Sequence, residues 1–377
     1  MRFSIVMPTY NRASLLRHSL PTALEQDHDD FEIVVSNNCS TDGTEQVVSE
    51  LATERLRLVR PDERLSMVDH WEFAVSQARG EWLLILCDDD ALLPDALTTL
   101  DGIAQDDPDC RLIQYDRFRY LYDDGIQDEG NYVEVGSRVS TSVIELDARR
   151  RLSTVFRRLS LELPKLLNAT AHRSLLDDLR ERHGRVFGIW APDVSVGVRM
   201  LAATPRYLKT GPLMLWGETM ESYGSGSRHD PDRILQFYRQ FPEFDGTLPL
   251  SPYPELLTIG NTIFDTLSRL KGELGPEWSH LEIDPVRFRK MLLEDVDLLA
   301  ASGHEQYREL ATRIRADLAE LSREPGRGWR RFLARLGDLP EKLRRLSAGR
   351  RSTGRKERHH FDNIHEAARF VGGLART

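Results

Sequence analysis

Three adjacent carboxylates, Asp88, Asp89 and Asp90, directly follow a short apolar run that begins at Trp82. Neighbouring acidic side chains repel one another, so such a cluster is unfavourable unless a cation or a dense hydrogen-bond network offsets the repulsion. Carboxylate oxygens are the ligands that Mg²⁺ and Mn²⁺ prefer, often together with a phosphate group. The alternative is a solvated acidic turn that caps the next helix. The stretch by itself is consistent with both.

Apolar runs that suit buried strands alternate with segments of helical spacing in the first hundred residues. We predict strands over Phe3–Met7, Phe31–Val35, Leu56–Val59 and the run from Trp82, and helices over 14–26, 45–51 and 66–78, the first partly broken by Pro21 and the last capped by Gly80. This order predicts an α/β fold with a mostly parallel sheet covered by helices on both faces.

Polar loops follow three of these predicted strands, at Thr9–Arg12, Ser36–Asp42 and Asp88–Asp90. Parallel strands bring their carboxyl ends to one edge of a sheet, where open α/β sheets bind ligands. We therefore expect the three loops to converge there, which favours a metal and phosphate site. The sequence has no glycine-rich phosphate motif after the first strand, so a diphosphate would depend on a metal at the aspartates.

The composition limits the class of protein. The chain has 377 residues, a formal net charge of -9 and three scattered cysteines, Cys39, Cys87 and Cys110. Three cysteines so placed argue against a disulfide framework or a zinc site. No apolar run approaches the roughly 20 residues that cross a bilayer, and the apolar part of the N-terminus is too short for a signal peptide. We predict a cytoplasmic protein.

The second half of the chain is predicted to be helical. Helical spacing covers 234–241, 253–270, 285–300 and 305–323, a loose loop is expected over 347–360, and a last helix over 362–374 docks back. We divide the chain into residues 1–230, which hold the α/β domain, and a helical region over 231–377. The helical region could fill the core, shape an acceptor site or form a homo-oligomer.

Positive charge is concentrated near the end of the chain, with 13 Lys or Arg against 4 Asp or Glu between residues 323 and 358. Residues 329–358 form a basic amphipathic pattern that suits peripheral contact with an anionic membrane surface, at the inner face of the membrane for a cytoplasmic protein. An ordinary helix with an arginine-rich outer face is the alternative. No nucleic-acid partner is predicted.

Three segments, Ile5–Arg12, Phe31–Thr44 and Ala78–Pro94, resemble family 2 glycosyltransferases with the GT-A fold. The resemblance is dense over about the first hundred residues and loose to about residue 230. It implies a sugar donor linked to UDP, GDP or dTDP, Mn²⁺ or Mg²⁺ at a DxD-like motif, and usually inversion at the anomeric carbon. It also implies an acceptor hydroxyl on a carbohydrate, a lipid-linked molecule or a natural product.

The resemblance also assigns site residues. It places in the nucleotide-sugar pocket Pro8, Thr9, Tyr10, Asn11, Arg12, Asn37, Asp42, Asp88 and Asp89, and at the metal Asp89, Asp90 and His229. Two positions depart from the family pattern. Asn37 replaces a common aspartate, which leaves the base of the nucleotide open, and Cys87 takes the first acidic position of the motif.

The general base is expected downstream, where the family has an acidic residue just ahead of a helix. Asp193 matches this position, with the alternative that it is an N-cap, and Glu218 is the second candidate. Lys165 and Asn168 are expected to face the acceptor. Other possible functions are a sugar-1-phosphate nucleotidyltransferase, although its usual glycine-rich loop is missing, and a non-catalytic scaffold that binds nucleotide sugars.

Overall fold

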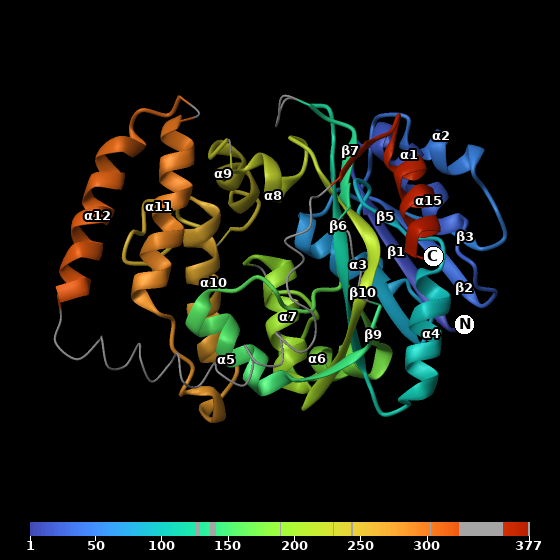
Figure 1. The fold of residues 1–377 in the computed structure, drawn as a ribbon, viewed down its shortest axis with the longest axis horizontal. Coiled ribbons are helices and arrows are strands. Elements are labelled where there is room, and N and C mark those ends of the chain that lie inside the picture. Colours follow the sequence, from blue (N-terminus) through green and yellow to red (C-terminus); the bar gives the residue numbers. More distant parts are fainter. Residues whose placement is uncertain are drawn as a thin grey trace.

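A single mixed sheet runs through the centre of the computed structural model, with helices on both sides and a helical extension beyond one face (Figure 1). The structure describes residues 1–124, 129–135, 141–188, 190–228, 230–242, 244–301, 303–323 and 357–375. Its strands are β1 Phe3–Thr9, β2 Phe31–Asn37, β3 Leu56–Val59, β4 Trp82–Ile85, β5 Ala91–Leu92, β6 Leu112–Leu121, β7 Tyr132–Val135, β8 Ile144–Asp147, β9 Ala169–His172, β10 Arg206–Glu218 and β11 Glu357–His360. The α/β fold class predicted from the sequence is confirmed.

The helices cover the sheet and build the extension. They are α1 Ala13–Leu24, α2 Thr44–Glu50, α3 Met67–Ser76, α4 Ala96–Asp106, α5 Ala148–Arg158, α6 Arg173–His183, α7 Pro192–Ala203, α8 Tyr223–Gly226, α9 Asp232–Tyr238, α10 Ile259–Glu273, α11 Pro285–Ala301, α12 Tyr307–Arg323 and α15 Ile364–Ala375. The helical extension predicted after residue 230 is present as α9 to α12, on the left of Figure 1.

Strands β3, β2, β1 and β4 lie side by side in that order, and all of their pairings are parallel. The pairing aligns Thr9 at the end of β1 with Asn37 at the end of β2, and Val6 with Ile85 near the end of β4. All three strands therefore end at one edge of the sheet. The sequence predicted this convergence, and the register confirms it.

Side chains alternate between the two faces of this parallel region. On β1, Ile5 and Met7 belong to the core under α1, α2 and α4, whereas Val6 belongs to the core under α3, α5, α6 and α7. The strands are apolar on both faces because helices cover both, as is usual for a parallel sheet. Burial of such a side chain stabilises the fold by roughly 1.5–3 kcal/mol, which makes the strand ends a rigid support.

Beyond β4 the sheet continues through β9, which is antiparallel to both β4 and β6. Strand β6 pairs in parallel with the long strand β10, and the register shifts between Thr210 and Met214. Strand β10 also pairs antiparallel with β5, which follows the aspartates directly, and with β8. Strand β10 thus reaches the carboxylate cluster from the second half of the chain.

The chain returns to the sheet after the helical extension. Strand β11 pairs antiparallel with β7, and α15 packs against α1, β5 and β10 (Figure 1). The predicted final helix that docks back is confirmed, whereas the loop predicted over 347–360 is wrong for 357–360, which is strand. The basic amphipathic segment lies outside the described residues over 329–356. The boundary at residue 230 stays a prediction, and α15 shares a core cluster with β5, β6, β7 and β10.

Two local predictions are corrected by the structure. Gly80 is not the cap of α3, which ends at Ser76 with Gln77 as C-cap. A Cβ at Gly80 would lie 2.6 Å from backbone atoms of Phe3 and Ser4, so a glycine there permits close approach of two chain segments. Helix α1 continues through Pro21. Within the described ranges, none of the helices has the length and apolar character that a membrane span requires.

His70 makes the stability of this fold depend on pH. It lies on α3, is 3% exposed and hydrogen-bonds through Nε2 with Ser36 Oγ at 2.8 Å. Burial lowers the pKa of His70 from its ordinary value of 6.5 to about 4, although the contact with Ser36 acts in the opposite direction. The unfolded chain therefore binds this proton more tightly than the folded protein.

The expected result is that the His70 contribution to the free energy of unfolding is complete above pH 6.5 and is lost as the pH falls towards 4. The slope is at most about 1.4 kcal/mol per pH unit. Urea unfolding at several pH values, with the His70→Gln variant in parallel, measures this contribution. An identical pH dependence in wild type and variant would contradict it.

Candidate active site

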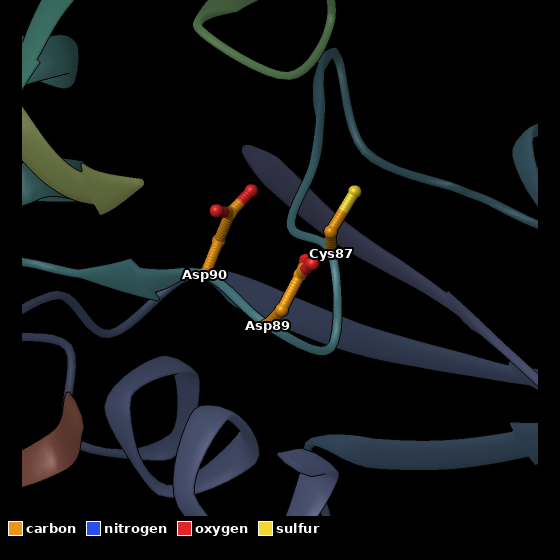
Figure 2. Close-up of side chains that lie close together, drawn as sticks. All are labelled: Cys87, Asp89 and Asp90. Carbon is orange, nitrogen blue, oxygen red and sulfur yellow. The ribbon is translucent and has the colours of Figure 1, made fainter. Parts of the chain in front are cut away.

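The aspartate cluster lies where β4 ends, between the parallel strands and β10. The chain turns there, with the Asp90 amide donating to the Cys87 carbonyl at 3.1 Å. The side chains of Cys87, Asp89 and Asp90 point to the same side of this turn (Figure 2). All three aspartates are buried, with exposed fractions of 4%, 6% and 3% along the chain.

Asp88 is neutralised by groups from the loop that follows β1. The Thr9 hydroxyl donates to its Oδ2 at 2.7 Å, and Arg12 Nη1 donates to its Oδ1 at 2.8 Å. The same guanidinium lies 3.6 Å from Asp89 and also donates to the carbonyl of Glu221. Arg12 thus joins β1, the aspartates and the segment after β10. Charge-assisted hydrogen bonds of this kind are roughly twice as strong as neutral ones.

Cys87, Asp89 and Asp90 form the group that could hold a metal ion. Their Sγ and carboxylate oxygen atoms lie within 4.8 Å of one another. Burial raises the pKa of Asp89, with Asp88 adding to the rise and Arg12 opposing it. Burial and the charge of Asp89 raise the pKa of Asp90 well above its usual range, and burial does the same for the Cys87 thiol.

Raised pKa values show that the protein's own positive groups and hydrogen-bond donors do not fully stabilise the negative charges of these buried carboxylates. A divalent cation would relieve both the burial and the mutual repulsion of Asp89 and Asp90. Two carboxylates fit Mg²⁺ or Mn²⁺, and the neighbouring thiol is a softer donor that Mg²⁺ does not favour. The donor set therefore fits a divalent metal. Asp88 points to Thr9 and Arg12 instead.

Strand β10 and the segments beside it position the aspartates, and sequence reasoning missed these residues. The Gly217 amide donates to Asp90 Oδ1 at 2.9 Å, and the Tyr122 hydroxyl donates to the Asp89 carbonyl at 3.0 Å. Ser222 Oγ donates to Asp89 Oδ2. A Cβ on Gly217 would lie 1.9 Å from the Asp89 carbonyl oxygen, so only glycine fits there. The antiparallel pairing of β10 with β5, a long-range contact, creates these neighbours.

The remaining residues of the predicted donor pocket lie on the two loops beside the cluster. Pro8 is the penultimate residue of β1, and the Tyr10 ring lies under the Arg64 guanidinium at 4.3 Å. Asn11 has a left-handed backbone with φ 52, which asparagine tolerates. Its Oδ1 accepts from the Thr41 amide at 2.8 Å and so joins the loops after β1 and β2.

The hydrogen bonds of Asn37 account for its departure from the family pattern. It is completely buried, its Oδ1 accepts from the Ser40 amide at 2.8 Å, and its Nδ2 donates to Glu45 Oε1 at 3.2 Å. An aspartate could not donate to Glu45 and would place a second carboxylate beside it. Asn37 and Glu45 are therefore a matched pair.

Asp42 joins two helices to each other. Its Oδ2 accepts from the amide of Ala13, the first residue of α1, and its Oδ1 accepts from Thr44, the first residue of α2. Burial alone would raise the pKa of Asp42, but these hydrogen bonds outweigh it and lower the pKa. Its carboxylate stabilises two helix N-termini, so the geometry gives it a structural task beside the predicted donor pocket.

Asp193 lies in the first turn of α7, and the N-cap of that helix is Ala191. The predicted alternative that Asp193 is the N-cap is therefore wrong. Its Oδ2 accepts from Lys165 Nζ. The Asp193 side chain is 28% exposed and that of Lys165 is 11% exposed. Asn168 holds the Lys165 turn, because its Oδ1 accepts from the Lys165 amide at 2.8 Å.

Glu218, the second candidate base, ends β10. Both of its carboxylate oxygens accept from Arg119, at 2.8 and 2.6 Å. A bidentate pair of this kind leaves less capacity to accept a proton from a substrate. His229, predicted as a metal ligand, lies outside the described residues.

The two candidate bases and the aspartate cluster all influence one arginine that sequence reasoning did not identify. Arg117 on β6 is exposed, and its guanidinium lies over the Trp216 ring at 3.9 Å. The carboxylates of Asp90, Asp193 and Glu218 all act on it electrostatically. They therefore belong to one region of the molecule.

Solved structures align with most of this chain at low sequence identity. A complex of Staphylococcus aureus TarS residues 1–349 with UDP-GlcNAc aligns with 82% of this chain and 92% of its own, at TM-score 0.48 and 16% identity. The mannosyltransferase PcManGT of Pyrobaculum calidifontis, in complex with GDP-Man and Mn²⁺, aligns with 83% of this chain and 84% of its own, at TM-score 0.42 and 19% identity.

Sequence relatives match over about a quarter of the chain. A GalNAc(5)-diNAcBac-PP-undecaprenol beta-1,3-glucosyltransferase of Campylobacter jejuni is 34% identical over 102 residues, which are 26% of this chain and 33% of the relative. The putative teichuronic acid biosynthesis glycosyltransferase TuaG of Bacillus subtilis is 28% identical over 96 residues, 25% of this chain and 38% of the relative. The match thus spans about a third of the length of these relatives.

Residues 4–163 match the model of glycosyl transferase family 2. The matched range covers nearly all of β1, together with β2, β4 and the aspartate turn, so it includes the predicted donor side of the site. Asp193 and Glu218 lie beyond it. The resemblance drawn from the sequence is confirmed over residues 4–163, the part of the chain that matches glycosyl transferase family 2.

Proposed function

We propose that this protein transfers a sugar, with inversion, from a nucleoside-diphosphate sugar to an acceptor hydroxyl. The observation that carries the proposal is the group of half-buried Cys87 and buried Asp89 and Asp90 at the edge where β1, β2 and β4 end. The match of residues 4–163 to glycosyl transferase family 2 supports the reaction type. It also counts against the sugar-1-phosphate nucleotidyltransferase that the sequence left open.

The metal would be held by Asp89 and Asp90, with Cys87 beside them, and Mn²⁺ or Mg²⁺ fits the two carboxylates. When bound, the ion would stabilise the negative charge that grows on the leaving diphosphate. Asp88 is bound by Thr9 and Arg12 instead, and we assign it to the nucleotide pocket rather than to the metal. A thiol in place of a carboxylate favours Mn²⁺ over Mg²⁺ at this site.

Asp193 is the better candidate for the general base. It is partly exposed, and within the described part of the chain its one hydrogen-bond partner is Lys165, through Oδ2. Glu218 has both oxygens engaged by Arg119. The Lys165 contact would orient the Asp193 carboxylate, because a buried ammonium group on a short turn fixes the side chain that it binds.

The reaction then balances without a protein nucleophile. The acceptor oxygen forms a bond to C1 of the sugar as the bond from C1 to the phosphate oxygen breaks. The electron pair of that bond leaves with the nucleoside diphosphate. The hydroxyl proton passes to the Asp193 carboxylate. One carboxylate as base on the face opposite to the leaving group gives inversion, as in inverting glycosidases.

The donor and acceptor are proposed by class. The donor carries UDP, GDP or dTDP, and the pair of Asn37 and Glu45 lies beside the position where the base or ribose would bind. A lipid-linked or polysaccharide acceptor is supported by the names of the two relatives described above. Peripheral membrane contact, a cytoplasmic location and a homo-oligomer stay predictions.

A melting-shift screen tests this proposal. We expect UDP, GDP or dTDP to raise the melting temperature in the presence of Mn²⁺, and EDTA to remove the effect, because a ligand that binds only the folded state stabilises it. A ligand at 100 times its Kd contributes about 2.7 kcal/mol. A protein whose melting temperature responds to none of the three nucleotides with Mn²⁺ would favour the non-catalytic alternative and contradict the proposal.

A further inference from the structure

Arg117 is a positively charged residue of the site to which the proposed transfer reaction has so far assigned no role. Arg117 is exposed on β6, and among the residues that the structure describes it forms no hydrogen bond and no ion pair. Its one contact of note is the Trp216 ring, 3.9 Å from the guanidinium carbon. A guanidinium stacked in this way has a fixed plane and keeps its N–H donors available.

The carboxylates around Arg117 already have partners of their own. Glu218 is bound by Arg119 at 2.6 and 2.8 Å, Asp193 by Lys165, and Asp116 by Lys209 at 2.7 Å. Each of these charges is therefore balanced without Arg117. Asp90 also acts on the Arg117 guanidinium electrostatically, but among the described residues it does not form a hydrogen bond with it, so the N–H donors of Arg117 stay available to a ligand.

The position of Arg117 is set by the strands. On β6, Phe118 and Tyr120 face the core under α15, so Arg117 and Arg119 face the opposite side of the sheet, the side on which α7 lies (Figure 1). The register of β10 against β6 shifts at Pro212 and Met214, which are paired with Asp116 and Arg117. Irregularities of this kind re-aim side chains and are common beside active sites.

The same position separates Arg117 from the donor side. The proposed donor loops follow β1, β2 and β4, whereas Arg117 lies on β6 and is paired with Met214 of β10. Arg12 is the arginine of that side, because it contacts Asp88 and Asp89. Arg117 instead lies on the face of β6 opposite to the core under α15, and the charges of Asp90 and of the proposed base Asp193 both act on its guanidinium. An acceptor whose hydroxyl meets Asp193 would pass beside Arg117.

We propose that Arg117, held by Trp216, binds an anionic group of the acceptor, a phosphate or a carboxylate close to the hydroxyl that is glycosylated. The proposal rests on the proposed glycosyl transfer and names its acceptor class as an anionic one. The planar fork of a guanidinium matches the oxygens of both anions, which a lysine would bind only as a point charge.

The test compares three probes in the presence of Mn²⁺: methyl glucoside, its 6-phosphate and methyl glucuronide. We expect wild type to bind the two charged probes at least tenfold more tightly than the neutral one. Arg117→Gln should weaken the charged probes roughly ten- to hundredfold and leave the neutral probe unchanged. Arg117→Lys should fall between the two. The matched control is Arg313→Gln. Arg313 is an exposed arginine on the distant α12, and its guanidinium lies 5.5 Å from the Tyr253 ring. This variant should bind all three probes like wild type.

A second arm measures UDP, GDP and dTDP with the same proteins. Unchanged nucleotide affinity in Arg117→Gln is expected. Equal losses for nucleotides and charged probes would assign Arg117 to the donor diphosphate and overturn the proposal. A wild type without preference for the charged probes over the neutral one would also overturn it. Failure of nucleotide binding in wild type contradicts the proposed transfer instead, so the two failures are distinguishable.

Discussion

Replacement of Asp89 by asparagine is expected to lower transfer by about a thousandfold or more while the fold survives. Asp89 is buried, points to the same side as Cys87 and Asp90, and is the carboxylate for which Asp88 cannot substitute, because Asp88 is bound by Thr9 and Arg12. Loss of one charged ligand removes stabilisation of the leaving group that metals and oriented donors supply, which is worth several kcal/mol. Initial rates with the donor identified in the melting screen measure the effect.

The variant also has a readout apart from turnover. Mn²⁺ together with the nucleoside diphosphate should raise the melting temperature of wild type and have little effect on Asp89→Asn, because the nucleotide depends on the metal. Asp95→Asn is the matched control, since Asp95 precedes α4 and its side chain makes no capping hydrogen bond. A fully active Asp89→Asn variant with an unchanged Mn²⁺ response would show that the metal ligands lie elsewhere.

The parallel half of the fold could be predicted because its signals are local. Each strand is a short apolar run that ends at a polar loop, and the register confirms that Thr9 and Asn37 end side by side. The position of the aspartates after β4 followed from the same pattern. Errors arose where a residue serves a distant contact. Gly80 was assigned to a helix cap, whereas it allows the chain to approach Phe3 and Ser4.

The other half of the site depends on contacts that no short window of sequence contains. Gly217 is hydrogen-bonded to Asp90, and Ser222 to Asp89, although more than a hundred residues separate each pair in the sequence. Arg117 and Trp216 become neighbours only when β6 pairs with β10. A signal was present in Leu215–Glu218, a polar ending on an apolar strand like those of β1 and β4. Glu218 was identified there as a candidate base, but the strand lies beyond the residues that match the family, and its contact with the aspartates was not predicted.

Replacement of Asp193 by asparagine is expected to lower transfer by roughly 10²- to 10⁴-fold, the usual contribution of a general base. Asparagine keeps the size of the side chain and its place in the first turn of α7, but it cannot accept the acceptor proton. Binding of the nucleoside diphosphate with Mn²⁺ should be unchanged, because the proposed donor loops follow β1, β2 and β4, whereas Asp193 lies on α7. The transfer rate and the nucleotide affinity are therefore measured separately, and only the rate should fall.

Comparison with Glu218→Gln decides between the two carboxylates. Glu218 is held by Arg119 through both oxygens, so we expect its replacement to reduce transfer less than Asp193→Asn does. Lys165→Met tests the orientation of Asp193, because it removes the ammonium group that contacts Oδ2 and leaves the carboxylate in place. The reduction of the transfer rate in Lys165→Met should be smaller than the reduction in Asp193→Asn. A larger loss in Glu218→Gln would move the base to the end of β10, and lost nucleotide affinity in Asp193→Asn would move Asp193 to the donor pocket. Asp177→Asn, on the exposed face of α6, is the control that should leave both rate and affinity unchanged.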